Sequence, residues 1–386
     1  MKKDWTYKKL GEVCDFEGGS QPPKSEWINS PKEGYVRMLQ IRDFTKSREA
    51  EIEYVKLSKK LRLCKSDDIL IGRYGASVGK ILTGLEGAYN VAIIKSIPDE
   101  SQILKRYIRR YFESCSFQQL LQKVCVVRTA QAGFAKDDIK DTLIPLPPLS
   151  EQSRIVSRLD AAFGEIEGLK AKAEAQLSEA RTLFQAALTQ EMKPKQGWEE
   201  KPLKELADYS IGLTYKPSDV SENGTIVLRS SNIQDDKLDL ADIVRVSCPI
   251  KDYLYVEKGD ILMCSRNGSA RLVGKVAVIP ETGEKMTYGT FMMIIRSKYN
   301  PFLFYFFKSD DFREQIKHGE ANMINQITRY MLDDVVLNVP PLSAQQSIVS
   351  RLDALSEKVR ELEETQKKVI AECDALKQAL LREVFE

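Results

Sequence analysis

Two stretches of the chain place arginine, serine and lysine on a glycine-rich loop that directly follows an apolar run. Residues 68–80 read DILIGRYGASVGK, and residues 260–275 read DILMCSRNGSARLVGK. The apolar run predicts a buried strand, and the glycines permit a hairpin. Guanidinium, hydroxyl and ammonium groups at a loop tip suit contacts with phosphates and base edges. One such loop alone would be better explained by a solvated hairpin with incidental charges, but its recurrence favours a nucleic-acid contact.

A second polar segment in each half follows an expected strand and adds further candidate contacts. Residues 35–39 and 226–229 read as strands, and a short polar segment comes directly behind each of them. Together with the loops, these segments supply polar groups that could meet nucleic acid. The candidate DNA-binding residues are Arg37, Gln40, Arg42, Arg73, Tyr74, Ser77, Lys80 and Arg128 in the first half, and Arg229, Asn232, Gln234, Arg266, Asn267, Ser269, Arg271 and Lys275 in the second.

The residues needed for common enzyme chemistry are missing from the sequence. The only histidine is His318, among charged residues, so a metal site of the usual type or a Ser-His or Cys-His relay has little to build on. The chain also has no GxxxxGK[ST] loop for a nucleotide. We therefore expect no catalytic residues, no metal site and no enzymatic activity in this chain.

These loops belong to two similar halves, each a globular block followed by a long helix. The heptapeptide IVSRLDA occurs at residues 155–161 and again at 348–354, which is an offset of 193 residues. Trp5 and Trp198, and Gly19 and Gly212, share that offset. The repeat predicts blocks at residues 1–143 and 193–336, and long helices at residues 144–192 and 337–386.

Apolar or small residues in both helical stretches recur at alternating steps of four and three, which is a heptad seam. Each helix should be roughly 60 Å long at 1.5 Å per residue, and Ser150 and Ser343 are the expected N-caps. Pairing of the two seams is favoured over two independent helices, each packed on its own block. The expected seam positions are Ile155, Leu159, Ala162, Ile166, Leu169, Ala173, Ala180, Leu183 and Ala187, and Ile348, Leu352, Leu355, Val359, Leu362, Val369, Cys373, Leu376 and Leu380.

Composition and charge fit a protein of the cytoplasm that meets a polyanion. The 386 residues include seven scattered cysteines with no CxxC pair, and neither a signal peptide nor a stretch long enough to span a membrane. Residues 1–143 carry 26 Lys and Arg against 19 Asp and Glu, whereas the second block carries 20 against 21. The basic first block gives modest support for a polyanion partner.

The duplicated entry into each long helix carries a resemblance to a known family. The sequence PLPPLSEQ at residues 145–152 and PPLSAQQ at 340–346, with the two glycine loops, is similar to the specificity (S) subunit of type I restriction–modification systems. The resemblance implies an α+β fold: two similar target recognition domains, mixed α/β with a β-rich core, separated by two long helices that form an antiparallel coiled coil. Each domain would read one half of a bipartite DNA sequence, and the helix pair would set the spacer length.

The resemblance also implies partners that carry the chemistry. Two adenine methyltransferase (M) subunits would dock on the helix entries and bring S-adenosylmethionine, this chain would hold no cofactor of its own, and two restriction (R) subunits could join them. A non-catalytic scaffold that binds proteins through its two blocks is the alternative function, and the nearly neutral second block favours it slightly. The expected partner-interface residues are Pro148, Ser150, Gln152, Arg158, Pro341, Ser343, Gln345 and Arg351.

Overall fold

The structure, a computed structural model, describes residues 5–45, 51–127, 133–317 and 326–386. The chain divides into two compact units. The first unit combines Met1–Glu174 with Lys367–Glu386, and the second is the continuous segment Ala175–Gln366. The last residues of the chain therefore belong to the same unit as the first domain.

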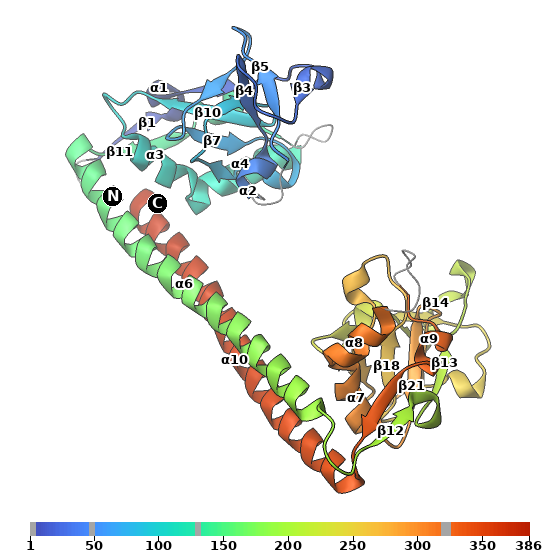
Figure 1. The fold of residues 1–386 in the computed structure, drawn as a ribbon. Coiled ribbons are helices and arrows are strands. Elements are labelled where there is room, and N and C mark those ends of the chain that lie inside the picture. Colours follow the sequence, from blue (N-terminus) through green and yellow to red (C-terminus); the bar gives the residue numbers. More distant parts are fainter. Residues whose placement is uncertain (1–4, 46–50, 128–132, 318–325) are drawn as a thin grey trace. The chain divides into compact units, whose positions relative to one another are not determined.

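The first domain is built on short strands that pair mostly antiparallel (Figure 1). A four-stranded sheet has the order β2-β10-β7-β8, and a five-stranded sheet the order β3-β5-β4-β9-β6, in which only β4 and β9 are parallel. A separate pair, β1 and β11, joins the start of the domain to the strand before the long helix. The strands are β1 (Thr6–Lys9), β2 (Cys14–Gly18), β3 (Trp27–Ile28), β4 (Tyr35–Leu39), β5 (Tyr54–Lys56), β6 (Leu63–Cys64), β7 (Ile69–Gly72), β8 (Ile81–Leu82), β9 (Gly87–Tyr89), β10 (Ile93–Pro98) and β11 (Leu143–Leu146).

The second domain repeats this plan, but its strands are divided into a six-stranded and a three-stranded sheet. The central sheet has the order β13-β21-β18-β19-β16-β15, beside a three-stranded sheet β17-β14-β20 and the pair β12-β22. The strands are β12 (Glu199–Pro202), β13 (Asp208–Ile211), β14 (Val220–Leu228), β15 (Ile233–Gln234), β16 (Lys237–Leu238), β17 (Val244–Val246), β18 (Ile261–Cys264), β19 (Val276–Val278), β20 (Met286–Tyr288), β21 (Met292–Arg296) and β22 (Val336–Val339).

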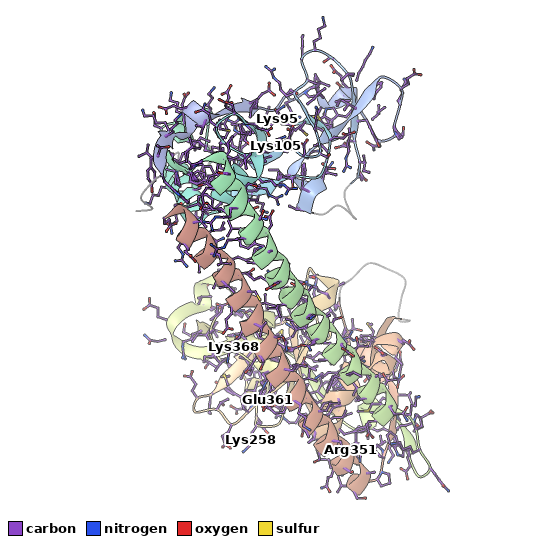
Figure 2. All side chains as sticks on the ribbon, turned by 90° about the vertical axis from the view of Figure 1, so that its left-hand side faces the viewer. Lys95, Lys105, Lys258, Arg351, Glu361 and Lys368 are labelled. Atoms are coloured by element: carbon purple, nitrogen blue, oxygen red, sulfur yellow. The ribbon has the colours of Figure 1, made fainter. Side chains whose placement is uncertain are left out.

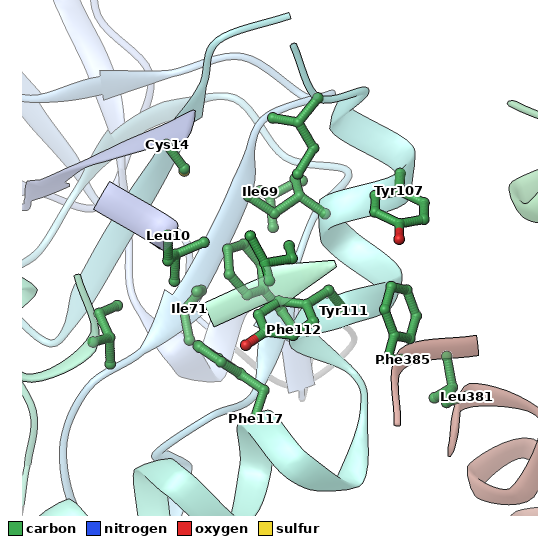
Figure 3. Packing of buried hydrophobic residues seen from close by; sticks show 14 of the residues in the cluster. Leu10, Cys14, Ile69, Ile71, Tyr107, Tyr111, Phe112, Phe117, Leu381 and Phe385 are labelled. Carbon is green, nitrogen blue, oxygen red and sulfur yellow. The ribbon is translucent and has the colours of Figure 1, made fainter. Parts of the chain in front are cut away.

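Short helices and aromatic side chains complete each domain core. In the first domain, Tyr107, Tyr111 and Phe112 of α3 are buried between the sheet and the end of the last helix (Figure 3). Phe385 lies there with its ring 5.2 Å from that of Tyr107 and 5.6 Å from that of Tyr111. The short helices are α1 (Leu10–Val13), α2 (Ile41–Thr45), α3 (Lys105–Phe112), α4 (Cys115–Val127) and α5 (Lys136–Ile139) in the first domain, and α7 (Asn300–Lys308), α8 (Asp310–Lys317) and α9 (Arg329–Asp333) in the second.

The two long helices are α6 (Leu149–Met192) and α10 (Leu342–Phe385), each of 44 residues. Within the first unit, Glu167 pairs with Lys377 at 2.5 Å and Lys170 with Asp374 at 2.8 Å. Later residues of α6 thus pair with earlier residues of α10, so the two helices are antiparallel. In the second unit, Arg351 near the start of α10 (Figure 2) bridges to Glu191 near the end of α6 at 2.7 Å. The predicted fold class, with an antiparallel helix pair, is confirmed.

The predicted seam holds only in part, because each helix also packs on a globular domain. Ile155, Leu159 and Ala173 are buried as expected, whereas Leu169, Leu183 and Leu376 are 50–61% exposed. Apolar residues outside the seam are buried instead against the domain cores, and these are Val156, Phe163, Leu188 and Leu381. Both long helices therefore have two apolar faces near their ends, one for the partner helix and one for a domain.

Both long helices begin two residues before the position that an N-cap at Ser150 or Ser343 would give. Since α6 starts at Leu149 and α10 at Leu342, Ser150 and Ser343 lie inside the first turn and are not N-caps. Within the described residues, no helix is both long and apolar enough to cross a membrane.

Candidate nucleic-acid interface

Both glycine loops are hairpin connections, as the sequence predicted. In the first domain β7 and β8 pair antiparallel, and a single 3₁₀ turn at Gly75–Ser77 lies between them. The loop closes through Gly79 N–H, which donates to Gly72 O at 3.0 Å. In the second domain β18 and β19 pair in the same way, and Gly274 N–H donates to Cys264 O at 2.8 Å. Gly79 and Gly274 have φ angles of +78° and +83°, which residues with a Cβ atom rarely adopt.

Each loop lies against a polar segment that includes the end of β4 in the first domain and follows β14 in the second, which we call the strand corner (residues 37–43 and 229–235). In the second domain the contact is direct: Asn267 Nδ2 donates to Ser230 Oγ at 3.1 Å, and Lys275 Nζ donates to Ile233 O at 2.7 Å. In the first domain Ile41 packs beside the apolar residues of the hairpin. The two sequence-predicted segments are thus neighbours in both domains.

A third segment, which the sequence did not single out, completes the arrangement in each domain. Tyr74 forms an isolated bridge with Gly133, and Arg73 Nε donates to Phe134 O at 3.1 Å. Arg266 forms the equivalent bridge with Gln326. The predicted contact Arg128 lies outside the described residues, a few positions before Gly133.

The loops present cations beside aromatic rings. The Arg73 guanidinium lies 5.2 Å from the Tyr74 ring, and that of Arg266 lies 5.4 Å from the ring of Phe291, which is 54% exposed. Ser77 and Ser269 are half-buried in the two loops, whereas Lys80 and Arg271 are exposed. Arginine over an exposed aromatic face is a common platform for bases, and an exposed lysine suits a phosphate.

Two buried carboxylates organise the strand corner of the first domain. Asp43, only 2% exposed, accepts from Arg37 at 2.9 Å and from the backbone N–H of Gln40 at 2.7 Å. Glu53, 6% exposed, accepts from Gln40 Nε2 at 2.9 Å and from Arg42 at 2.6 Å. Burial raises the pKa of Glu53, but hydrogen bonds from Lys24 and Gln40 and the nearby cations outweigh it, so the pKa is lowered overall. No pattern in the sequence indicated Glu53, because its partners lie 11 to 29 residues away.

The equivalent corner of the second domain corrects one predicted contact. Asn232 is 0% exposed, its Oδ1 accepts from Arg229 N–H, and its Nδ2 donates to the carbonyls of Asp239 and Asp242. A buried carboxamide with these three hydrogen bonds stabilises the turn and is not available to DNA. Arg229 bridges to Asp242 at 2.8 Å, and Gln234 is exposed, with its Nε2 donating to Ser231 O.

The helix entries require a second correction. Gln152 is 0% exposed and Gln345 5% exposed, so neither can meet a partner. Their Nε2 atoms donate to the equivalent proline carbonyls, Pro147 O at 2.9 Å and Pro340 O at 2.8 Å, which fixes the turn into each helix. The other predicted interface residues are exposed: Pro148, Ser150, Arg158, Pro341, Ser343 and Arg351.

Nothing in the described parts of the chain gathers three or more His, Cys, Asp or Glu side chains around a point where a metal could bind. His318 lies outside the described residues. The candidate site of each domain is therefore a surface of loops, cations and amides around a hairpin.

Comparison with known proteins agrees with this arrangement. The model of a family described as the type I restriction modification DNA specificity domain matches residues 2–178 and again residues 195–372. The two matches begin 193 residues apart, as the internal repeat does. The described domains and helices thus correspond to two copies of one family unit.

One relative and one solved structure cover most of the chain, and a second relative covers less than half of it. The type I restriction enzyme MjaVIII specificity subunit of Methanocaldococcus jannaschii is 23% identical, over 92% of this chain and 87% of that protein. The EcoKI specificity subunit of Escherichia coli is 28% identical over 42% of this chain and 36% of that protein. A solved structure from work on complex assembly and conformational transition of the type I R-M system contains a chain with a TM-score of 0.75. That chain is 20% identical, and the match covers 99% of this chain and 97% of the other.

Proposed function

Because the chain belongs to the family of type I restriction modification DNA specificity domains, we propose that it is the DNA-recognition subunit of such a system. Each domain reads one half of a bipartite target through its glycine loop and strand corner. The helix pair sets the number of unread base pairs between the halves.

The observation that carries the proposal is the recurrence of one surface with different side chains. Both domains join a hairpin loop to a strand corner, but the loops read GRYGASVGK and CSRNGSARLVGK. The shared geometry suits a common way of approaching the duplex, and the differing side chains suit two different half-sites. Phosphate contacts from exposed cations such as Lys80 would set the register, while amides and guanidinium groups would read base edges.

The duplicated helix entries support two identical docking sites for a partner. Pro148 and Ser150 on α6 are exposed, as are Pro341 and Ser343 on α10, although the domains beside them differ. We assign these surfaces to two methyltransferase subunits, which bring S-adenosylmethionine and the methyl transfer to adenine. Restriction subunits join the same complex, this chain performs no chemistry, and the complex works in the cytoplasm.

The decisive experiment maps methylated adenines on DNA exposed to the purified chain together with its methyltransferase partner. We expect a single bipartite motif with a fixed spacer, two methyltransferase chains per copy of this chain by native mass measurement, and no methyl transfer by the chain alone. Methylation without a bipartite motif would favour the scaffold function. Transfer by rigorously partner-free chain would overturn its non-catalytic role.

A further inference from the structure

The carboxamide of Gln40 is held on one side only. Its Nε2 donates to Glu53 Oε2 at 2.9 Å, and the residue is half-buried at the end of β4. No donor among the described residues reaches Gln40 Oε1. The side chain therefore keeps one acceptor and one of its two N–H groups for an outside partner.

The ionisation of Glu53 fixes which way the Gln40 amide faces. An ionised carboxylate is an acceptor only, so the nitrogen end of Gln40 must face Glu53 and the oxygen end must face away. The lowered pKa of Glu53 keeps that carboxylate ionised at neutral pH. The outward pair, one acceptor beside one donor, matches the N6 donor and N7 acceptor that adenine shows in the major groove.

Glu53 itself is fixed from several sides. Arg42 donates to the same Oε2 at 2.6 Å, Lys24 pairs with Oε1, and the carboxylate is 7% exposed. The Lys24 ammonium also lies 4.1 Å from the centre of the Trp27 ring. A carboxylate with three donors cannot rotate away from Gln40 without losing other bonds. The side chains of Arg42 and Lys24 are 45% and 67% exposed, so these cations could meet phosphates while they hold Glu53.

The second domain has a different side chain at the place of Gln40. Arg229 is the first residue after β14, as Gln40 is after β4, and each donates its backbone N–H to the side chain three residues on, Asn232 Oδ1 at 2.9 Å and Asp43 Oδ2 at 2.7 Å. The buried Asn232 therefore corresponds to the buried Asp43, and Arg229, which pairs with Asp242 at 2.8 Å, corresponds to Gln40. Equivalent positions thus carry a guanidinium in one domain and an amide in the other, which suits two different half-sites.

We propose that Glu53 is a positioning residue for DNA specificity, which orients Gln40 so that the first domain prefers adenine at one base pair of its half-site. The inference rests on the proposed function. Glu53 does not touch the base. It fixes which edge of the Gln40 amide the base meets, and Gln40 makes the contact.

The test uses the complete complex with its methyltransferase partner and measures base preference position by position, on a library randomised across both half-sites. Gln40→Ala should reduce the adenine preference at one position by about 5- to 150-fold, since a good bidentate contact discriminates by about 1–3 kcal/mol. Glu53→Gln should weaken the adenine preference at the same position, because the NH₂ group of the new amide would face N–H donors that now bind the carboxylate. The double variant, which carries Gln40→Ala and Glu53→Gln, should lower the adenine preference at that position no further than Gln40→Ala alone. Asp141→Asn, which breaks an exposed ion pair with Lys9 in the same domain, is the matched control and should change no position.

The outcomes separate this inference from the proposed function. If the unaltered complex shows no bipartite preference, the proposed function fails. If it shows one, but Gln40→Ala leaves every position unchanged, only this inference is overturned. Loosening at many positions by Glu53→Gln would assign it a purely structural role and also contradict the inference. If Glu53→Gln does not fold, Gln40→Ala alone decides whether the amide reads adenine, and Glu53→Asp, which shortens the reach, replaces it as the positioning test.

Discussion

If the helix pair sets the spacer, lengthening both helices by the same amount should change the spacer and leave the half-sites intact. The ion pairs Glu167–Lys377 and Lys170–Asp374 define which levels face each other. By that register, an insertion directly after Ala173 in α6 lies opposite an insertion directly after Ile370 in α10. Seven residues inserted at both places keep the heptad repeat of each seam and the pairing on either side.

The expected change follows from helix geometry. Seven residues at 1.5 Å each lengthen the pair by about 10 Å, which corresponds to roughly three base pairs at 3.4 Å. Three base pairs also rotate the second half-site by nearly a third of a turn, since about 10 make a full turn. We therefore expect the original half-sites with a spacer about three base pairs longer, or a loss of methylation where the pair cannot absorb that rotation.

Methylome sequencing of cells that carry the variant and its methyltransferase partner measures the spacer directly. The matched control inserts the same seven residues after Lys193, which is exposed and follows the end of α6. This control should keep the original spacer. An unchanged spacer at full occupancy in the double-helix insertion would refute the ruler and assign the separation of half-sites to the methyltransferase subunits.

Three further substitutions test the loop and the first core. Lys80→Ala should weaken binding to all sequences alike and reduce the salt slope of log K by about 0.9, whereas Arg73→Ala should cost about 1–3 kcal/mol at one base pair of the first half-site. Salt titrations and base-by-base binding measurements compare the Lys80→Ala and Arg73→Ala variants with the control Lys9→Ala. If all three variants bind DNA alike, the loop makes no specific contact and is a solvated hairpin. Phe385→Ala should lower the free energy of unfolding of the first unit by about 3–5 kcal/mol, measured by hydrogen exchange. Leu376→Ala, 50% exposed on the same helix, should change it by less than about 0.5 kcal/mol, so equal effects would contradict the packing.

Features encoded locally could be predicted from the sequence. The hairpins follow from an apolar run and glycines within about a dozen residues, and they are present in both domains. The long helices follow from their apolar period and from the absence of proline within them. The repeat itself supplied the two-domain plan, because a shared offset survives where individual side chains differ.

Features that depend on distant partners could not be predicted. Gln152 looked like a surface residue, yet it is bound to Gln102 and Leu104, which lie about 50 residues earlier. Glu53 is likewise held by partners 11 to 29 positions away, whereas the partners of the buried Asn232 lie only 3 to 10 positions away. The exposure of the seam residue Leu183 could not be predicted either. The apolar period of a helix does not indicate where along its length it packs on another helix and where it packs on a domain.

The place of Phe385 has a consequence for how the protein is made. The first domain leaves the ribosome before the second, but Tyr107 and Tyr111 gain their cover only when Phe385 has been added. The 192 residues of Ala175–Gln366 are translated in between, which takes on the order of 10 to 40 seconds at about 5–20 residues per second. During that time the continuous second unit can complete its own core, while the first retains an uncovered aromatic face. We therefore expect the domain that is synthesised first to finish folding after the second unit, and a nonsense mutation between the codons of Gln366 and Phe385 to damage the first domain.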